Sequence, residues 1–316
     1  METALHVILG SGGAIGTPLA RELISRGERV RTVSRSGKSE PGCEQVRADL
    51  ADGRQTVAAL EEGSTVYLLV GLPYDSRVWR SAWPEIMANV IAACEAKRAR
   101  LLFLDNVYAY GAVKGPMTEE TPMRPSSEKG RIRAEIAARL FSEMHTGRIN
   151  ALIARAADFY GPHAASNSIP YAMALQPLLA GKAQRWLVSA KKKHSFSYTL
   201  DCARALALLG RTDDAFGQVW HLPTAAPPLD GEEFMGIAAR TLGRPLRYSV
   251  LPKAVVGLAG LFDRTILEIY RMTYQNDRDY VFDSSKFERR FSFSPTPYDK
   301  GIEETLNFFR TAPGSA

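Results

Sequence analysis

Three glycines spaced three residues apart, Gly10, Gly13 and Gly16, follow an apolar run near the N-terminus and constrain the fold more than any other feature. The run, residues 5–9, predicts a buried strand, and apolar residues at helical spacing after it predict a helix leading to a second strand at 29–33. Strand, tight turn and helix in this order are typical of a dinucleotide-binding βαβ unit. Gly10 would allow the turn, Gly13 the approach of a pyrophosphate, and Gly16 close packing of the helix.

Main-chain amides at the start of this helix are the predicted contacts of the diphosphate, because the N-terminal end of a helix attracts anions. The residues predicted to form this part of the site are Gly10, Gly12, Gly13, Ala14, Ile15 and Gly16. A second loop, at Val70 and Gly71, follows another buried strand and belongs at the same carboxyl edge of the sheet. We expect both loops to contact the nucleotide.

The second strand ends at Ser34 and Arg35, where an NAD site usually presents a carboxylate to the adenosine ribose. A guanidinium beside hydroxyl groups suits a 2′-phosphate through charge-assisted hydrogen bonds. We therefore predict NADP as the cofactor in preference to NAD, with a solvated surface arginine as the alternative interpretation.

Charge and composition exclude several classes of protein. The 316 residues include 40 Lys and Arg against 34 Asp and Glu, a net charge of +6 that is spread thinly and does not indicate nucleic-acid binding. A hydrophobic content of 45% with 23% charged residues is typical of a soluble globular protein. The longest late apolar stretch, residues 254–262, is too short to span a bilayer, so no membrane association is expected.

Cysteine and histidine usage indicates neither disulfides nor metal. Three cysteines without close spacing, Cys43, Cys94 and Cys202, fit a reducing compartment, and with no signal-peptide pattern at the N-terminus we expect a cytoplasmic protein. The histidines, which are His6, His145, His163, His194 and His221, show no metal-ligand spacing. No metal site is predicted.

Strands and helices alternate along most of the chain, which predicts an α/β fold with a doubly wound parallel sheet of the Rossmann type. The predicted nucleotide-binding domain comprises residues 1–161 and 194–222. Residues 162–193 and 223–316 are predicted to form a smaller, mostly helical substrate-binding domain.

Motifs in the middle of the chain make the resemblance specific. The segments 106–111, 119–125, 155–162 and 283–295 stand in register with motifs of one superfamily. With the glycine spacing, they resemble the extended and atypical branches of the short-chain dehydrogenase/reductases, of the NAD-dependent epimerase/dehydratase kind. The resemblance implies that Asp49, Leu50 and Tyr160 also lie at the nucleotide. Asp49 could instead cap the following helix.

The catalytic pattern of that superfamily is broken here. Its members ordinarily use a Tyr-x-x-x-Lys pair on a helix and a Ser or Thr from the preceding strand. In this chain Lys129 stands in place of the tyrosine, Arg133 in place of the lysine, and Asn106 in place of the Ser or Thr. All three ordinary catalytic residues are therefore replaced.

The replacements could still support catalysis. Lys129 and Arg133 are four residues apart and share a helix face. Arg133 could bind ribose hydroxyls, Lys129 could donate a proton if crowding and burial lower its pKa, and Asn106 could face an oxyanion. The alternative is a solvated helix face. Tyr74 and Tyr108, on loops at the carboxyl edge, are further candidates, although either could simply be a packing residue.

Two apolar and aromatic rows, at 169–179 and 262–274, fall in the predicted substrate domain. They are either core or the lining of a cleft for an apolar or aromatic small molecule. The resemblance also implies a homodimer through the helices near 80–98 and 126–145.

Three hypotheses for the function follow. The first is an NADPH-dependent reductase of a carbonyl, imine or activated alkene with a non-standard proton donor. The second is a redox-neutral epimerase or dehydratase that uses bound NAD(P). The third is a sensor or interaction protein that binds NADP without turnover.

Overall fold

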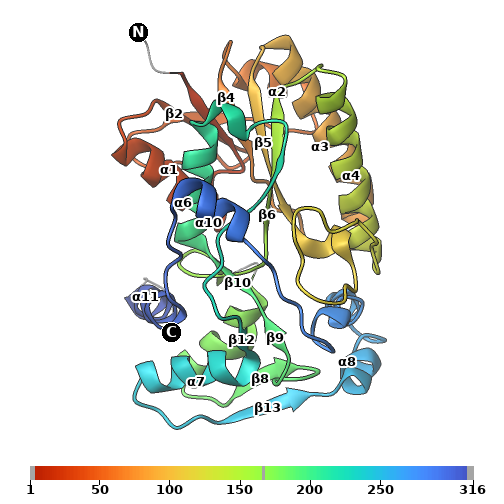
Figure 1. Cartoon of the computed structure of the whole chain (residues 1–316), viewed down its shortest axis with the longest axis vertical. Coiled ribbons are helices and arrows are strands. Elements are labelled where there is room, and N and C mark those ends of the chain that lie inside the picture. Colours follow the sequence, from red (N-terminus) through yellow and green to blue (C-terminus); the bar gives the residue numbers. More distant parts are fainter. Residues whose placement is uncertain (1–3, 166–167, 312–316) are drawn as a thin grey trace.

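A seven-stranded parallel sheet forms the centre of the protein, whose computed structural model describes residues 4–165 and 168–311 (Figure 1). Its order is β11-β6-β5-β4-β1-β2-β3. The strands are β1 (His6–Leu9), β2 (Val30–Ser34), β3 (Glu44–Arg47), β4 (Thr65–Leu68), β5 (Arg100–Asn106), β6 (Ala151–Ala156) and β11 (Val219–His221). Every ladder between them is parallel. The predicted doubly wound sheet is confirmed.

Strand β1 lies at the point where the winding of the sheet reverses. It pairs with β2 on one side and with β4 on the other, so the chain moves outward in both directions from β1. Loops that follow β1 and β4 therefore meet at the carboxyl edge of the sheet, where ligands of such folds bind. The sheet thus brings the segments after Leu9 and Leu68 together.

Helices cover both faces of the sheet. Because side chains alternate along a strand, Val7 and Leu9 pack on one face and Ile8 on the other. The first face is covered by α2 (Gly53–Ala59), α3 (Ser76–Ala96) and α4 (Glu128–His145). The second is covered by α1 (Gly16–Ser25), α6 (Thr199–Gly210) and α10 (Ser285–Phe291). Figure 1 shows the two helical layers on opposite sides of the strands.

The remaining elements form a smaller C-terminal part beside the carboxyl edge (Figure 1). Its strands pair two by two: β7 (Asp158–Tyr160) with β10 (Phe196–Tyr198), β9 (Lys193–His194) with β12 (Leu229–Asp230), and β8 (Gln184–Leu187) with β13 (Tyr248–Leu251). Its helices are α5 (Gln176–Leu179), α7 (Gly231–Thr241), α8 (Lys253–Ala259), α9 (Arg264–Tyr270) and α11 (Tyr298–Thr311). A C-terminal region rich in helices is therefore present, as the predicted fold class requires. In the described part of the chain, no helix is suited to cross a bilayer.

Several local predictions are corrected by the structure. The side chain of Asp52 rather than Asp49 accepts the first amide hydrogen bonds of α2. Helix α10 packs its Phe287 against the sheet, although the sequence-based division places it with the substrate domain. In the apolar row at 169–179, Leu175 lies in the core of the C-terminal part, with Tyr171 and Leu179 packed against that core.

His221, at the end of β11, is a buried histidine held in its neutral form. Its Nδ1 lies 2.8 Å from the carbonyl oxygen of Asp283, which can only accept, so Nδ1 carries the proton. The other nitrogen, Nε2, then accepts from the hydroxyl of Tyr110 at 2.6 Å. Burial is the main cause that lowers the pKa of His221 to about 3.

Acid should therefore destabilise the protein through His221. The unfolded chain takes up a proton near pH 6.5 and the folded chain only near pH 3, so stability falls as the pH drops through this window. We expect His221→Gln to reduce the loss of unfolding free energy between pH 7 and pH 4.5 by about 2 kcal/mol. Urea denaturation at both pH values measures this, with His145→Gln, at an exposed histidine, as control. Equal pH slopes in wild type and His221→Gln would contradict the prediction.

Candidate active site

The turn after β1 is built so that only glycine fits at two of its positions. Gly10 has a φ of +98°, and a Cβ there would lie 2.9 Å from the backbone of Val70. A Cβ at Gly16 would lie 2.7 Å from the carbonyl oxygens of Gly10 and Ser11. At Gly13 the nearest atom would be 3.7 Å away. Gly10 and Gly16 therefore allow close packing of loop and helix, while Gly13 leaves an open surface.

This open surface fits the diphosphate of a dinucleotide. Helix α1 begins at Gly16, directly beyond the carboxyl end of β1, and in the described structure no side chain caps its N-terminus at Ile15. Ala14 and Ile15 are buried, whereas Gly12 is exposed and Gly13 half-buried. Amides at such an uncapped helix end are left for an anionic ligand.

The end of β2 carries positive charge, where the adenosine ribose of a dinucleotide would lie. Arg35 is exposed, Ser34 is half-buried, and the side chain of Lys38 lies against Gly12. The Ser11 hydroxyl donates to the Lys38 carbonyl at 2.8 Å, which holds this segment over the glycine turn. Lys38 is a member of the site that the sequence prediction left out, although it lies only three residues after Arg35.

The other predicted nucleotide contacts divide into loop and core residues. Asp49 is exposed and Gly71 is exposed, so both remain candidates, and the Val70 backbone touches the turn at Gly10. Leu50, however, is a buried core residue whose side chain faces away from solvent. Its predicted contact is available only through its backbone.

Tyr160 is not placed at the nucleotide turn. Strand β7 leaves the main sheet to pair with β10, which carries the Tyr160 ring into the core of the C-terminal part. There the ring is 1% exposed and packs with Tyr198 and Tyr298, with centroids 5.2 and 5.9 Å away. The predicted cofactor contact of this ring is wrong, because core side chains surround it.

Helix α4 presents Lys129 and Arg133 to the interior. The Ser127 hydroxyl accepts the amide hydrogen of Gly130 at 3.1 Å and so starts the helix at Glu128. Lys129 then falls in the first turn and Arg133 one turn later. They are 1% and 3% exposed, so the interpretation as a solvated helix face is wrong.

Arg133 is tied to the end of β5. Its Nε donates to Asp105 Oδ1 at 2.7 Å, and its Nη2 donates to the Leu104 carbonyl at 3.0 Å. Arg155 Nε donates to the other oxygen of Asp105 at 3.1 Å. The structure thus places Arg133 in a buried network with Asp105 and Arg155, and its predicted contact with the ribose stays a prediction.

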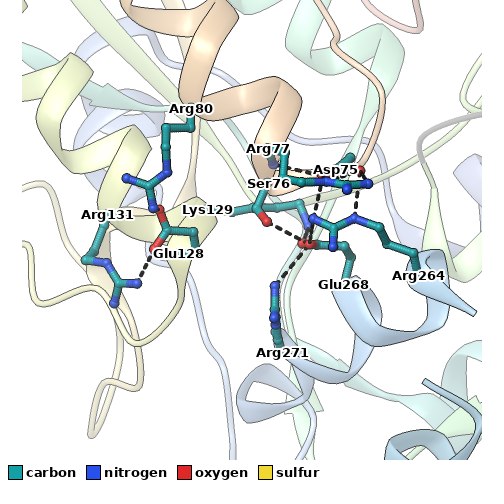
Figure 2. A network of polar contacts seen from close by, with 10 residues as sticks. All are labelled: Asp75, Ser76, Arg77, Arg80, Glu128, Lys129, Arg131, Arg264, Glu268 and Arg271. Atoms are coloured by element: carbon teal, nitrogen blue, oxygen red, sulfur yellow. Dashed lines mark hydrogen bonds and ion pairs between the residues drawn. The ribbon is translucent and has the colours of Figure 1, made fainter. Parts of the chain in front are cut away.

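Lys129 forms a buried ion pair with Glu268 of α9, and both side chains are 1% exposed (Figure 2). The Ser76 hydroxyl also donates to Glu268, at 2.7 Å. Burial lowers the pKa of Lys129 despite the nearby carboxylate. Burial alone would raise the pKa of Glu268, but the bonds from Lys129 and Ser76 outweigh it and hold this pKa below its ordinary value. These bonds favour the carboxylate form of Glu268.

Tyr74 and Tyr108 lie beside this pair. The Lys129 ammonium sits 3.8 Å from the centre of the Tyr74 ring, and the two tyrosine hydroxyls are 3.3 Å apart. Burial raises the pKa of both phenols, so they remain protonated and can act as donors but not as bases near neutral pH. The structure thus brings together three of the five predicted catalytic residues, Lys129, Tyr74 and Tyr108.

Asn106 has a local structural role. Its side-chain oxygen accepts the amide hydrogen of Tyr108 at 3.0 Å and caps the short 3₁₀ turn Val107–Tyr110. The partner that sequence reasoning missed is Glu268. Glu268 lies within the row at 262–274, which the sequence analysis describes as apolar and aromatic. No neighbouring residue indicates its contact with Lys129, 139 positions earlier.

A cavity of about 830 Å³ opens beside the ion pair, between the starts of α3 and α4 and the α8–α9 segment. We call it the arginine groove. It is lined by Ser76, Arg77, Arg80, Ser126, Ser127, Glu128, Arg131, Lys253, Arg264, Tyr270, Arg271, Thr273 and Tyr274. Charged side chains dominate this lining, so the groove does not match the expectation of an apolar or aromatic substrate pocket.

A match to a family model, which covers the glycine turn and the strands of the main sheet, shows the family of this chain. A family model described as the NAD dependent epimerase/dehydratase family matches residues 6–221. The chain belongs to this family. The resemblance to the extended short-chain dehydrogenase/reductases is confirmed, as is the prediction of an NAD(P)-dependent enzyme type. No curated protein matches the chain significantly.

Solved structures show the same fold over nearly the whole chain. A dTDP-glucose 4,6-dehydratase from Bacillus anthracis in complex with NAD superposes with a TM-score of 0.77 at 14% identity, covering 99% of this chain and 98% of that one. A Thermus thermophilus UDP-glucose 4-epimerase complex with NAD gives 0.78 at 18%, covering 98% and 99%. A UDP-glucuronic acid 4-epimerase from Bacillus cereus in complex with NAD gives 0.78 at 15%, covering 96% and 98%. At such identities the likeness establishes the fold.

Substitutions at two glycines of the turn should separate folding from nucleotide binding. Gly16→Ala pushes a Cβ against backbone oxygens that cannot move aside, so we expect a loss of about 1–3 kcal/mol of unfolding free energy. Gly13→Ala meets nothing closer than 3.7 Å, so stability should be retained while the added methyl group obstructs the diphosphate. Urea denaturation and fluorescence titration with NADPH measure the two effects. Full nucleotide affinity in Gly13→Ala would contradict the proposed cradle.

Proposed function

We propose that this chain binds a nicotinamide dinucleotide across the Gly10–Gly16 turn and catalyses a redox-neutral reaction on a small organic substrate, with Lys129 as the proton-transferring group. When bound, the nicotinamide supplies a position that takes up a hydride and returns it. The observation that carries the proposal is the burial of Lys129 at the start of α4, on the carboxyl edge of the sheet. Its pKa is lowered, and its ammonium group pairs with the carboxylate of Glu268. A lysine in this state exchanges protons nearer neutral pH than a solvated lysine.

The reaction class is supported by the family and by the epimerases and dehydratases whose fold the chain shares. In an epimerisation of this kind the proton that leaves the substrate returns to it, so a single group can serve both steps. The ion pair is suited to taking up and returning a proton, because Glu268 stabilises the charged ammonium of Lys129 while burial favours the neutral amine. Arg133 and Arg155 donate hydrogen bonds to Asp105 and so fix the position of the end of β5.

The residues at the end of β2 bear on the choice between NAD and NADP. The relatives named above were solved with NAD. In this chain, however, Ser34, Arg35 and Lys38 stand where an NAD site usually has a carboxylate, and this supports NADP. NADP in turn supports a second candidate function, a reductase that consumes NADPH.

The packing of Tyr74 on Lys129 supports a third candidate, a protein that binds the nucleotide without turnover. The ring covers the ammonium at 3.8 Å, and the Tyr108 hydroxyl stands 3.3 Å from that of Tyr74. Side chains thus occupy the volume beside Lys129. Turnover would require Tyr74 to move when a substrate enters.

Replacing Arg35 should change nucleotide preference. We expect NADP to bind at least tenfold more tightly than NAD, and Arg35→Ala to weaken NADP binding about tenfold while leaving NAD unchanged, since a hydrogen bond between charged groups contributes about 1.5–3 kcal/mol. Isothermal titration calorimetry with the oxidised and reduced forms of both nucleotides measures this. Arg98→Ala removes a guanidinium at an exposed position elsewhere and serves as control. Equal loss of NAD and NADP binding would show that Arg35 does not read the 2′-phosphate.

A turnover assay with Lys129 variants tests the function itself. Incubation with candidate hydroxy and carbonyl compounds should give isomerised or dehydrated product without net change in nucleotide. Lys129→Arg keeps a cation for Glu268 but cannot release its proton, and Lys129→Met/Glu268→Gln removes both charges. Both variants should bind nucleotide normally and lose at least 100-fold in turnover. Net NADPH consumption would instead identify the reductase, and binding without any product would identify the non-catalytic protein.

A further inference from the structure

The arginine groove carries more positive than negative charge. In and beside it, six cationic side chains share three carboxylates (Figure 2), and a seventh, Lys253, pairs with Asp277. The six cations are Arg77, Arg80, Lys129, Arg131, Arg264 and Arg271, and the three carboxylates are Asp75, Glu128 and Glu268. The local excess of positive charge is therefore large for a chain whose net charge is +6.

The carboxylates of this network do not saturate its guanidinium groups. Asp75 pairs with both Arg77, at 3.0 Å, and Arg264, at 2.8 Å. Glu128 likewise lies between Arg80 and Arg131. Each guanidinium carries five N–H donors, and exposed ion pairs of this kind contribute only about 0–1 kcal/mol each. Donor capacity in the groove exceeds what its own acceptors use.

Two helix ends add to the positive potential. Helix α3 starts at Ser76 and α4 at Glu128, and both first turns lie in the lining of the groove. The N-terminal end of a helix carries a partial positive charge that reinforces anion binding. Guanidinium groups gathered in one concavity repel one another unless an anion neutralises them.

We propose that the arginine groove binds the phosphate or carboxylate groups of a small polyanion, which is the substrate. The second half of this statement rests on the proposed function. Guanidinium forks hold both kinds of anion through paired hydrogen bonds. A volume of about 830 Å³ accommodates a small organic molecule, and the rings of Tyr270 and Tyr274 offer an apolar wall for its carbon skeleton.

The groove is linked to Lys129 through one carboxylate. Arg264 and Arg271 lie 3.5 and 3.2 Å from Glu268, whose other partner is the Lys129 ammonium. A polyanion held by the two arginines is therefore one side chain away from the proton-transferring group.

Titration calorimetry with pyrophosphate and, separately, malonate tests the anion site. Arg80→Gln/Arg131→Gln removes two guanidiniums whose side chains are 66% and 56% exposed, so folding should be retained. We expect both probes to bind the wild type, and at least a tenfold rise in Kd in the double variant. The tighter probe identifies the anion as phosphate or carboxylate.

Arg98→Gln/Arg290→Gln is the matched control. It removes the same charge at two surface arginines, each paired with its own carboxylate, outside the groove. The Kd should change less than twofold. An equal loss of affinity in both double variants, or no binding of either probe to the wild type, would overturn the proposal.

Gly13→Ala separates this site from the glycine turn. Binding of pyrophosphate in the groove should be unchanged by this substitution, whereas binding at the turn should be lost. A wild type that binds pyrophosphate in the groove but no nucleotide would refute the proposed function and leave the anion site standing. A wild type that binds nucleotide but no anion in the groove would refute the anion site and leave the proposed function standing.

Discussion

The burial of one lysine at the start of α4 determines how the two parts of this protein fit together. Lys129 lies in the first helical turn, where the helix end already repels a cation, and water is excluded from it. A carboxylate from elsewhere must accompany such a charge, and α9 provides Glu268. Replacing such a pair by apolar residues is often neutral, but removing one partner costs about 3–5 kcal/mol. The pair therefore specifies where α9 docks more than it adds stability.

Docking of α9 in turn places the groove arginines. Arg264 lies one helical turn before Glu268 and Arg271 three residues after it, so both are carried to the same side as the carboxylate. Arg264 then reaches across to Asp75 at the start of α3. One buried contact thus sets the geometry of a polar surface built from three separate segments.

The altered catalytic positions form part of the same arrangement. Arg133 takes the family's lysine position and becomes a partner of Asp105, together with Arg155 from β6. Asn106 takes the Ser or Thr position and caps a 3₁₀ turn. Two of the three replaced groups therefore support the carboxyl edge. Lys129, whose pKa is lowered, pairs with Glu268, and Glu268 in turn contacts Arg264 and Arg271 of the arginine groove.

Local signals predicted the sheet and the glycine turn but not the ion pairs. The alternation of strands and helices and the spacing of Gly10, Gly13 and Gly16 are local sequence patterns, and they can be read without knowledge of the fold. Charged residues on a helix are normally solvated, so the sequence left burial of Lys129 and Arg133 as one of two interpretations. Their partners, Glu268 and Asp105, come from distant segments, and only the packed structure shows which carboxylate meets which cation.

The parallel sheet itself explains why anion sites accumulate at one edge. Each βα connection delivers a helix N-terminus to the carboxyl end of its strand, so α1, α3 and α4 all direct positive ends there. At α1 the end is uncapped and open, as a bound diphosphate requires. At α3 and α4 it is capped by Asp75 and Ser127 and surrounded by guanidiniums that share too few carboxylates. In the absence of a ligand these carboxylates limit the repulsion between cations, and an entering polyanion would compete with them for the same donors.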